Sequence, residues 1–267
     1  MIKLASLITT VISLLCSPAL VAQPFELSLR LKNDSAAVLP AAQVCGLTPL
    51  TLNARAYDWQ ISGSRTVQQG DRQYCLTHDV LGPYQSQQLV LHWQPTTPLQ
   101  HDSWSPAAPF DLTSDASAQL LALADSFAGY PEREKVERIY AWMLDNIEFS
   151  GIRRGVEGAE HALQVGKGDC TEHMLLAGEL LERNGVTIRR VLGSALPKDQ
   201  HRITAATLHN WIEYLDNGTW LVFDSSRRLL GAPEKVRYVA LLFYQSRQQL
   251  TQETFTTDLP QLKLFLQ

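Results

Sequence analysis

The chain has 267 residues, 45% of them hydrophobic, which is enough for one large domain or two ordinary ones with a sizeable core. Its formal net charge is −4 at pH 7, with both signs interspersed, so it lacks the basic footprint that nucleic-acid binding requires. Beyond the N-terminal segment no apolar run is long enough to span a bilayer, because the best one, residues 238–244, is too short.

Residues 1–22 have the pattern of a secretory signal peptide. Lys3 provides the positive start, residues 4–15 provide the apolar run, and a stretch rich in small residues follows as a cleavage region. A membrane anchor is the alternative, but the run is short and its flank is cleavable. Lipid attachment at Cys16 is a further alternative. A bacterial lipoprotein signal places a small residue before its cysteine, however, and Leu15 is not small. We therefore expect a periplasmic or secreted protein.

Removal of the signal leaves three cysteines, which are Cys45, Cys75 and Cys170. In an oxidising compartment an odd number indicates one disulfide and one free thiol. Cys45 and Cys75 both lie in the strand-rich first third of the chain, so they are the expected pair. Two buried free cysteines are the alternative, which such a compartment disfavours. Cys170 then remains unpaired.

The first part of the mature chain is expected to form a β-rich domain over residues 23–94, most simply a small β-sandwich. Its strand signals are runs of β-forming residues separated by turn residues. A polar stretch punctuated by four prolines follows, and we interpret residues 95–112 as a linker. The runs that indicate strands are 25–31, 72–76 and 88–93.

Residues 113–267 are expected to form the second domain. Apolar residues at helical spacing come first, and the period then changes to that of strands. Helices followed by an antiparallel sheet make an α+β fold. The helical segments are 120–127, 131–147, 159–165 and 170–184, and the strands are 186–192, 208–215, 219–224 and 238–244.

Cys170 is placed where a thiol becomes reactive, at the start of a predicted helix. Asp169 is a suitable N-cap and Glu172 completes a capping box. The unpaired N–H groups and the dipole of a helix N-terminus favour a thiolate and can hold a developing oxyanion. Gly166 and Gly168 let the preceding backbone pass close to a substrate. An inert buried cysteine is the alternative.

A β-hairpin brings a histidine and an aspartate to one face. Asn217-Gly218 is a strong two-residue turn signal, and it places Asp224 opposite Trp211. Because side chains alternate along a strand, His209 and Asp224 are then diagonal neighbours, about 7–8 Å apart along the backbone. A three-residue turn would break this relation.

The histidine, the aspartate and the cysteine together match a nucleophile, its base and the group that orients the base. Asp224 ends an apolar run and needs a partner, which His209 can be. A lone strand histidine is the alternative interpretation of His209. His173 is a rival base, but no carboxylate is placed to orient it. The remaining histidines have no ligand-like spacing, so no metal site or cofactor is assigned: His78, His92, His101, His161 and His201.

Residues 118–226 resemble the transglutaminase-like domain, a branch of the papain-like cysteine enzymes. Three blocks carry the resemblance: Gly-Lys-Gly-Asp-Cys at 166–170 with the helix after it, the strand block at 184–193, and the hairpin from His209 to Asp224. The resemblance implies a papain-like α+β core and a Cys170, His209 and Asp224 triad. Serines 225 and 226 follow the aspartate, where the family commonly has a proline. The N-terminal β-region has no family match.

These patterns predict a secreted or periplasmic cysteine enzyme that transfers acyl groups from a peptide or protein substrate. Hydrolysis of an amide or isopeptide bond is favoured, because no calcium loop of alternating carboxylates is visible. A transglutaminase that passes the acyl group to an amine would use the same residues. A non-catalytic binding module that keeps the fold is the third possibility. The oligomeric state is not predicted.

Residues 194–206 join two predicted strands and are long for such a connection. Because the stretch directly precedes His209, we expect it to overhang the cleft as a lid. Lys198, His201 and Arg202 would then favour acidic groups of the substrate. A surface loop without function is the alternative.

Overall fold

The computed structural model describes residues 24–47, 55–62, 67–69, 73–98, 110, 116–152, 155–251 and 253–267. The expected signal peptide lies outside the described residues, and so does most of the expected linker. Among the residues described, no helix is long and apolar enough to cross a membrane.

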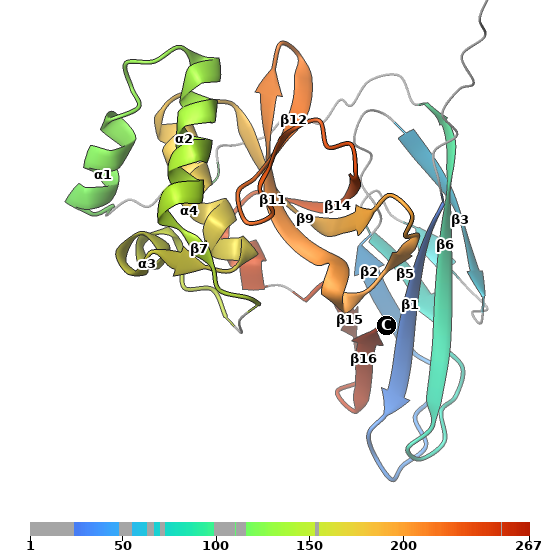
Figure 1. Cartoon of the computed structure of the whole chain (residues 1–267). Coiled ribbons are helices and arrows are strands. Elements are labelled where there is room, and N and C mark those ends of the chain that lie inside the picture. The colour runs from blue at the N-terminus through green and yellow to red at the C-terminus, as the bar shows by residue number, and fades with distance from the viewer. Residues whose placement is uncertain are drawn as a thin grey trace, which may run out of the picture.

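A β-sandwich forms at one end of the molecule, as expected, from two sheets that share an apolar core (Figure 1). Leu27, Leu29 and Leu31 alternate along the first strand and are fully buried. One sheet runs β10 (Arg202–Ile203), β1 (Phe25–Asn33), β6 (Ser86–Pro98) and β3 (Arg55–Ser62), with β16 (Leu262–Leu266) also paired to β1. The other runs β15 (Phe255–Thr257), β2 (Gln43–Leu47), β5 (Gln73–Thr77) and β4 (Val67–Gln69).

The C-terminal strands belong to this sandwich, which corrects the expected boundaries of 23–94 and 113–267. β16 lies antiparallel to β1, with Leu31 opposite Leu264, and β15 lies antiparallel to β2. Leu262 is buried in the sandwich core. The chain therefore returns to its first domain after the second, because the outer edges of β1 and β2 offer backbone groups that only a further strand can pair.

The linker expected over residues 95–112 begins inside β6. On one side β6 pairs with β1 only as far as Trp93, and on the other side it continues along β3, with Pro98 opposite Arg55. Proline is tolerated in a strand where one edge needs no donor. Pro95 and Pro98 lie in that part of β6, so they do not end it.

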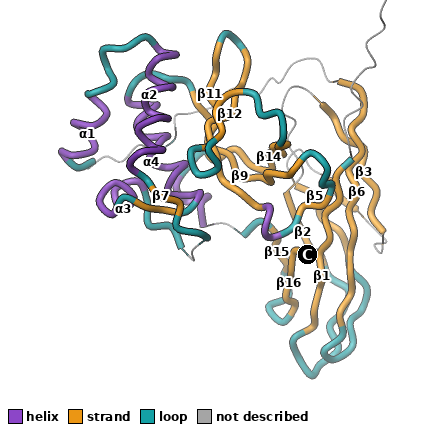
Figure 2. Tube along the Cα trace, in the orientation of Figure 1, coloured by secondary structure: helices purple, strands orange, loops and turns teal. Residues whose placement is uncertain are grey.

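The rest of the chain forms four helices, within the described ranges, against an antiparallel sheet (Figure 2). The central helix contacts the other three and two strands of the sheet, and each residue of 172–181 is buried. The expected α+β arrangement is thus confirmed. The helices are α1 (Ala118–Asp125), α2 (Glu132–Asn146), α3 (Ala159–Val165) and the central α4 (Cys170–Arg183). The sheet runs β13 (Leu229–Gly231), β12 (Thr219–Asp224), β11 (Leu208–Asp216), β9 (Ile188–Pro197) and β14 (Val236–Tyr244).

Shorter elements connect these parts. β7 (Glu148–Phe149) and β8 (Lys167–Gly168) pair in parallel and bring the chain to the start of α4. The 3-10 helix η1 (Ala205–Thr207) directly precedes β11, and the 3-10 helix η2 (Arg247–Thr251) follows β14.

The single long lid loop expected over residues 194–206 is wrong, because residues 194–197 belong to β9, residues 202 and 203 form β10, and η1 begins at Ala205. β9 extends to Pro197, and β10 pairs in parallel with β1. Leu196 and Ile203 are fully buried in the sandwich core. Arg202 forms an ion pair with Glu26 of the sandwich at 2.8 Å, so its charge is paired within the protein. Burial of Leu196 and Ile203 in the sandwich core therefore fixes the position of this stretch.

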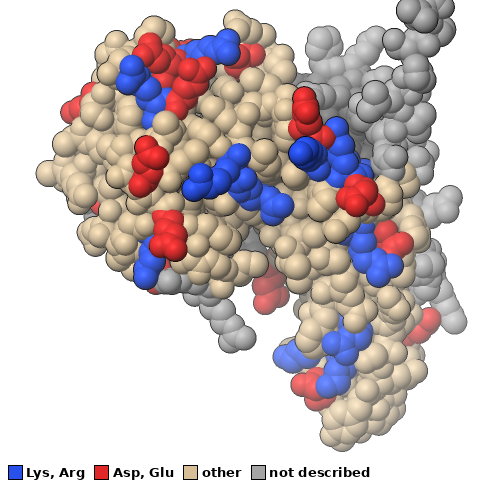
Figure 3. Space-filling model, viewed as in Figure 1, with Lys and Arg blue, Asp and Glu red and all other residues tan. Residues whose placement is uncertain are grey.

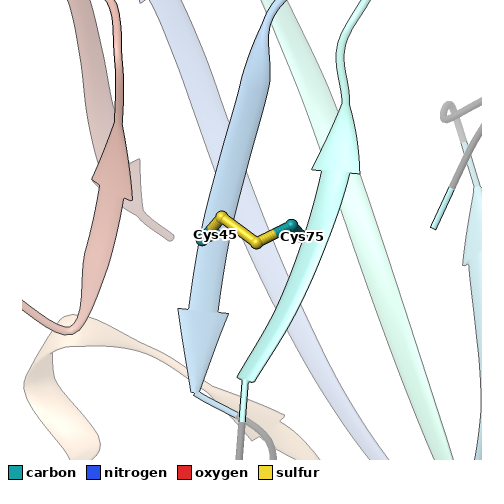
Figure 4. The surroundings of a disulfide bond; sticks show 2 residues. All are labelled: Cys45 and Cys75. Carbon is teal, nitrogen blue, oxygen red and sulfur yellow. A yellow bond between two sulfur atoms is a disulfide. The ribbon is translucent and has the colours of Figure 1, made fainter. Parts of the chain in front are cut away.

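Cys45 and Cys75 form the expected disulfide (Figure 4). They lie directly opposite each other on β2 and β5, with their Cα atoms 4.1 Å apart. The bond therefore joins neighbouring strands of the sandwich and closes a loop with a sequence separation of 30.

Loss of this disulfide should destabilise the protein. On the chain-entropy model a loop of this length contributes about 3–4 kcal/mol to the free energy of unfolding. We expect Cys45→Ser/Cys75→Ser to lower the denaturant midpoint accordingly, measured by circular dichroism in urea. Cys170→Ser is the matched control, since it removes a thiol that is in no disulfide. An unchanged midpoint for the double variant would contradict the assigned role of the bond.

Candidate active site

The predicted capping box is present at the start of α4. The Asp169 carboxylate accepts a hydrogen bond from the Thr171 N–H at 2.7 Å, and the Glu172 carboxylate accepts one from the Asp169 N–H at 3.2 Å. Cys170 is the first residue of the helix and is 9% exposed. Its side chain is thus held at the positive end of the helix dipole.

Glu172 also fixes the loop in front of the helix. Its other oxygen accepts hydrogen bonds from the N–H groups of Glu157 and Gly158, at 3.0 and 3.4 Å. Gly168 packs so tightly against the Glu172 side chain that a Cβ at this position would collide with it. Glycine is therefore required at 168 for close packing onto Glu172.

The hairpin has the register that the sequence predicts. Asp216 lies opposite Thr219, and Ile212 lies opposite Phe223. Asn217 and Gly218 have φ angles of 47° and 80°, which is the two-residue turn with positive φ at both central positions.

The hairpin brings His209 and Asp224 into contact. His209 Nε2 and Asp224 Oδ2 are 2.7 Å apart, and both side chains are buried. Cys170 also interacts with the His209 side chain and helps to raise its pKa. The ring nitrogen Nε2 is bound to Asp224. The structure thus brings together the three residues predicted for the site.

Two further side chains bind the Asp224 carboxylate. The Tyr238 hydroxyl donates to Oδ2 at 2.7 Å, and the Ser226 hydroxyl donates to Oδ1 at 2.7 Å. The Arg227 N–H donates to Oδ1 at 3.1 Å. Sequence reasoning missed both side chains. The hairpin register, which puts Ser226 opposite His209, could have indicated the serine; nothing in the local sequence marks the tyrosine.

These contacts set the charges of the pair. Burial opposes protonation of His209, but its hydrogen bonds to Asp224 and Cys170 raise its pKa to about 9. Burial likewise opposes ionisation of Asp224, yet its hydrogen bonds from His209, Tyr238 and Ser226 lower its pKa below the ordinary value. At neutral pH the pair is therefore an imidazolium and a carboxylate.

Aromatic packing orients the imidazole ring. Trp211 stacks on His209, with ring centroids 6.3 Å apart and planes 14° from parallel. The Trp211 indole N–H donates to Glu213 at 3.1 Å, which fixes the ring in turn. A Cβ at Gly193, opposite His209 on β9, would collide with Trp211.

Asn210 connects the strand of the histidine to the helix of the cysteine. Its side-chain N–H donates to the Thr171 hydroxyl at 2.9 Å, and its carbonyl oxygen accepts from the Tyr244 hydroxyl at 3.2 Å. Thr171 follows Cys170 directly and Asn210 follows His209. This bridge therefore keeps the thiol and the imidazole at a constant separation.

Cys170 and His209 open into a cleft of about 510 Å³. Its walls are mainly apolar, and two of the apolar side chains, Ile152 and Val156, are 72% and 37% exposed. Ala205 is the one residue of 194–206 that lines this cleft. The cleft therefore places a thiol and an imidazole beside mainly apolar walls.

His173 does not line this cleft. It is 4% exposed, its Nδ1 lies 2.9 Å from the Ser225 hydroxyl, and it borders a separate cavity of about 480 Å³. Burial lowers its pKa. Ser225, which stands where the family pattern commonly has proline, thus holds His173. No group of three or more metal-ligating side chains is present among the described residues.

The model of the transglutaminase-like superfamily matches residues 122–225, a segment that contains Cys170, His209 and Asp224. The chain therefore contains a transglutaminase-like domain over residues 122–225. No curated protein sequence matches it.

The fold of the chain is similar to that of a candidate cysteine protease from Cytophaga hutchinsonii. The two are 14% identical, the match covers 92% of this chain and 90% of that one, and the TM-score is 0.52. The periplasmic domain of TgpA from Pseudomonas aeruginosa is 14% identical, over 76% and 88% of the two chains, at a TM-score of 0.43. LapG from Legionella pneumophila is 14% identical, the match covers 49% of this chain and 81% of that one, and the TM-score is 0.38. The first likeness is one of fold.

Tyr238 comes from β14, outside the segment that matches the transglutaminase-like model. Tyr238→Phe removes the hydroxyl that binds Asp224 and should lower kcat about tenfold with little change in KM, because the imidazole loses orientation and the substrate contacts remain. Steady-state kinetics measure both constants. Tyr214→Phe is the matched control, since Tyr214 lies on β11 away from Asp224. Equal kcat values for the two variants would refute this role.

Proposed function

We propose that this protein is an extracytoplasmic thiol hydrolase that cuts an amide or isopeptide bond in a peptide or protein. Cys170 is the nucleophile, His209 the acid and base, and Asp224 the group that orients the histidine. The observation that carries the proposal is the arrangement of His209 between the Asp224 carboxylate at 2.7 Å and the Cys170 thiol.

The reaction would run in two halves. The Cys170 thiolate attacks the carbonyl carbon, the carbon–nitrogen bond breaks, and the His209 imidazolium gives its proton to the leaving amine, which leaves a thioester on Cys170. Neutral His209 then takes a proton from water, the water oxygen attacks the thioester, and the Cys170 thiolate departs as the product acid forms. Each half uses the same histidine, first as an acid and then as a base.

The backbone N–H of Cys170 is the proposed oxyanion donor. At the first turn of α4 the Thr171 N–H is bonded to Asp169, and the Asp169 N–H is bonded to Glu172. The N–H at the first helical position has no partner within a helix, and it lies beside the sulfur.

The location is proposed to be the periplasm or the exterior. The Cys45–Cys75 disulfide supports an oxidising compartment. The signal-like residues 1–22 support export.

The pH dependence of kcat/KM should report His209. Because the imidazolium must give its proton to the leaving amine, kcat/KM should fall as the pH rises through about 9, the pKa of His209. Asp224→Asn removes the carboxylate that raises this pKa, so its alkaline limb should move to lower pH. Initial rates across pH 6–10 locate the alkaline limb of kcat/KM for the wild type and for Asp224→Asn. An identical alkaline limb in the two proteins would contradict the assignment.

Hydrolysis and amine transfer can be separated by their products. A library of amide-containing peptides is incubated with the protein in the presence of cadaverine, and the products are identified by mass spectrometry. We expect hydrolysed peptides to dominate, and none with Cys170→Ala. If cadaverine adducts dominate instead, the protein is a transglutaminase, and if the peptides stay intact, the hydrolase proposal fails.

A further inference from the structure

The β-sandwich has an apolar opening on the side of the catalytic cleft. A cavity of about 740 Å³ lies between the edge strands β15 and β16, and apolar side chains of both strands line it, including Phe255, Leu264 and Leu266. These three side chains are partly buried and pack against the sandwich core. Figure 3 shows a notch between the helical half of the molecule and the sandwich, and Figure 1 places β15 and β16 beside that notch.

β16 presents backbone groups at this opening. Main-chain hydrogen bonds join Gln267 to Ser28 and Asp34 to Gln261, on either side of the paired stretch. Because such bonds alternate along an antiparallel pair, the N–H and C=O of Leu264 point away from β1. Within the described residues, β16 pairs with β1 alone. An edge of this kind is a template for one more extended strand.

The opening adjoins the cleft that holds Cys170. Leu208, the residue before His209, lines both spaces. Leu250 and Thr251 line the cleft, and Glu253 and Thr254, after one intervening residue in the chain, line the opening. A chain bound at the nucleophile can therefore extend along these walls to β16.

We infer that the β15–β16 opening is a binding site for an extended, mainly apolar segment of the polypeptide substrate, remote from the bond that is cut. The segment adds to the edge of β16 through backbone hydrogen bonds at Leu264, and alternate side chains enter the apolar space. The inference rests on the proposed function for the polypeptide nature of the ligand. Recognition of the substrate then depends on a surface that the C-terminal strands β15 and β16 help to form.

The test uses the full chain with Cys170→Ala, immobilised and mixed with a synthetic library of random dodecapeptides. We expect the recovered peptides to carry apolar residues at alternating positions. Leu264→Pro, added to Cys170→Ala, removes the outward N–H and should weaken their binding at least tenfold. Leu264→Glu keeps the backbone and places a charge in the opening, so it decides the question if the proline variant melts early. Val38→Ala, at an exposed loop residue, is the control.

A second readout separates this site from the chemistry. Leu264→Pro and Leu264→Glu are also made with Cys170 intact and treated with p-nitrophenyl acetate, whose acyl group is too small to reach the opening. Undiminished acylation together with weakened peptide binding supports the inference. Peptides that bind all variants equally, or no recovered peptide at all, would overturn it. Absence of acylation in the wild type would instead refute the proposed function.

Discussion

Cys170→Ala should abolish acyl transfer and leave the protein folded. Without the sulfur no thioester can form, and we expect turnover to fall by a factor on the order of 10³ or more, as it does when a covalent nucleophile is removed. The side chain is small, lies at a helix start and is in no disulfide, so the melting temperature should change little. The rate of peptide cleavage and the thermal melt measure the two expectations.

Cys170→Ser is the informative companion of this variant. A hydroxyl occupies nearly the same volume but is a far weaker nucleophile than a thiol in this setting, so turnover should also be lost while the fold is retained. If Cys170→Ala turned over substrate at the wild-type rate, the thiol would have no part in the chemistry.

His209→Ala should lower turnover almost as much as loss of the cysteine. The thiol would lose the base beside it, and the leaving amine would lose its proton donor. Asp224 would then lose the imidazolium partner at 2.7 Å and remain a buried carboxylate, bonded to Tyr238 and Ser226. We therefore expect a lower melting temperature as well, because a buried charge without its partner is costly.

His173→Ala is the matched control for that variant. His173 lies on the same helix as Cys170, three positions later, and is as buried as His209. It binds Ser225 and does not line the cleft, so its loss should reduce stability and leave kcat within a few-fold of the wild type. Equal losses of kcat in the two histidine variants would exclude His209 as the specific base.

Local patterns predicted the two elements that carry the site. The capping residues Asp169 and Glu172 mark the start of α4 on their own, because each bonds to backbone within three positions. The turn at Asn217-Gly218 sets the register of the whole hairpin, and that register determines which residues share a face with His209. Both are short-range relations, and the sequence contains them in full.

Long-range pairing was not predictable in the same way. Leu262, Leu264 and Leu266 lie on one face of β16, which indicates a strand. The pattern does not indicate that its partner is β1, more than 200 residues earlier in the chain. The apolar residues of 194–206 were too sparse to indicate a strand, and burial of Leu196 and Ile203 becomes visible only with the sandwich in place. Tyr238 was missed for a related reason, since a tyrosine in an apolar strand looks like core.

The most direct test of the account is whether Cys170 alone becomes acylated. The wild type is mixed with p-nitrophenyl acetate, quenched in acid, and mapped by mass spectrometry alongside Cys170→Ala and His209→Ala. We expect one rapid acyl group per chain, on Cys170, which is absent in Cys170→Ala and forms much more slowly in His209→Ala. A wild-type Cys170 that stays unmodified, or one acylated equally fast when His209 is removed, would contradict this expectation.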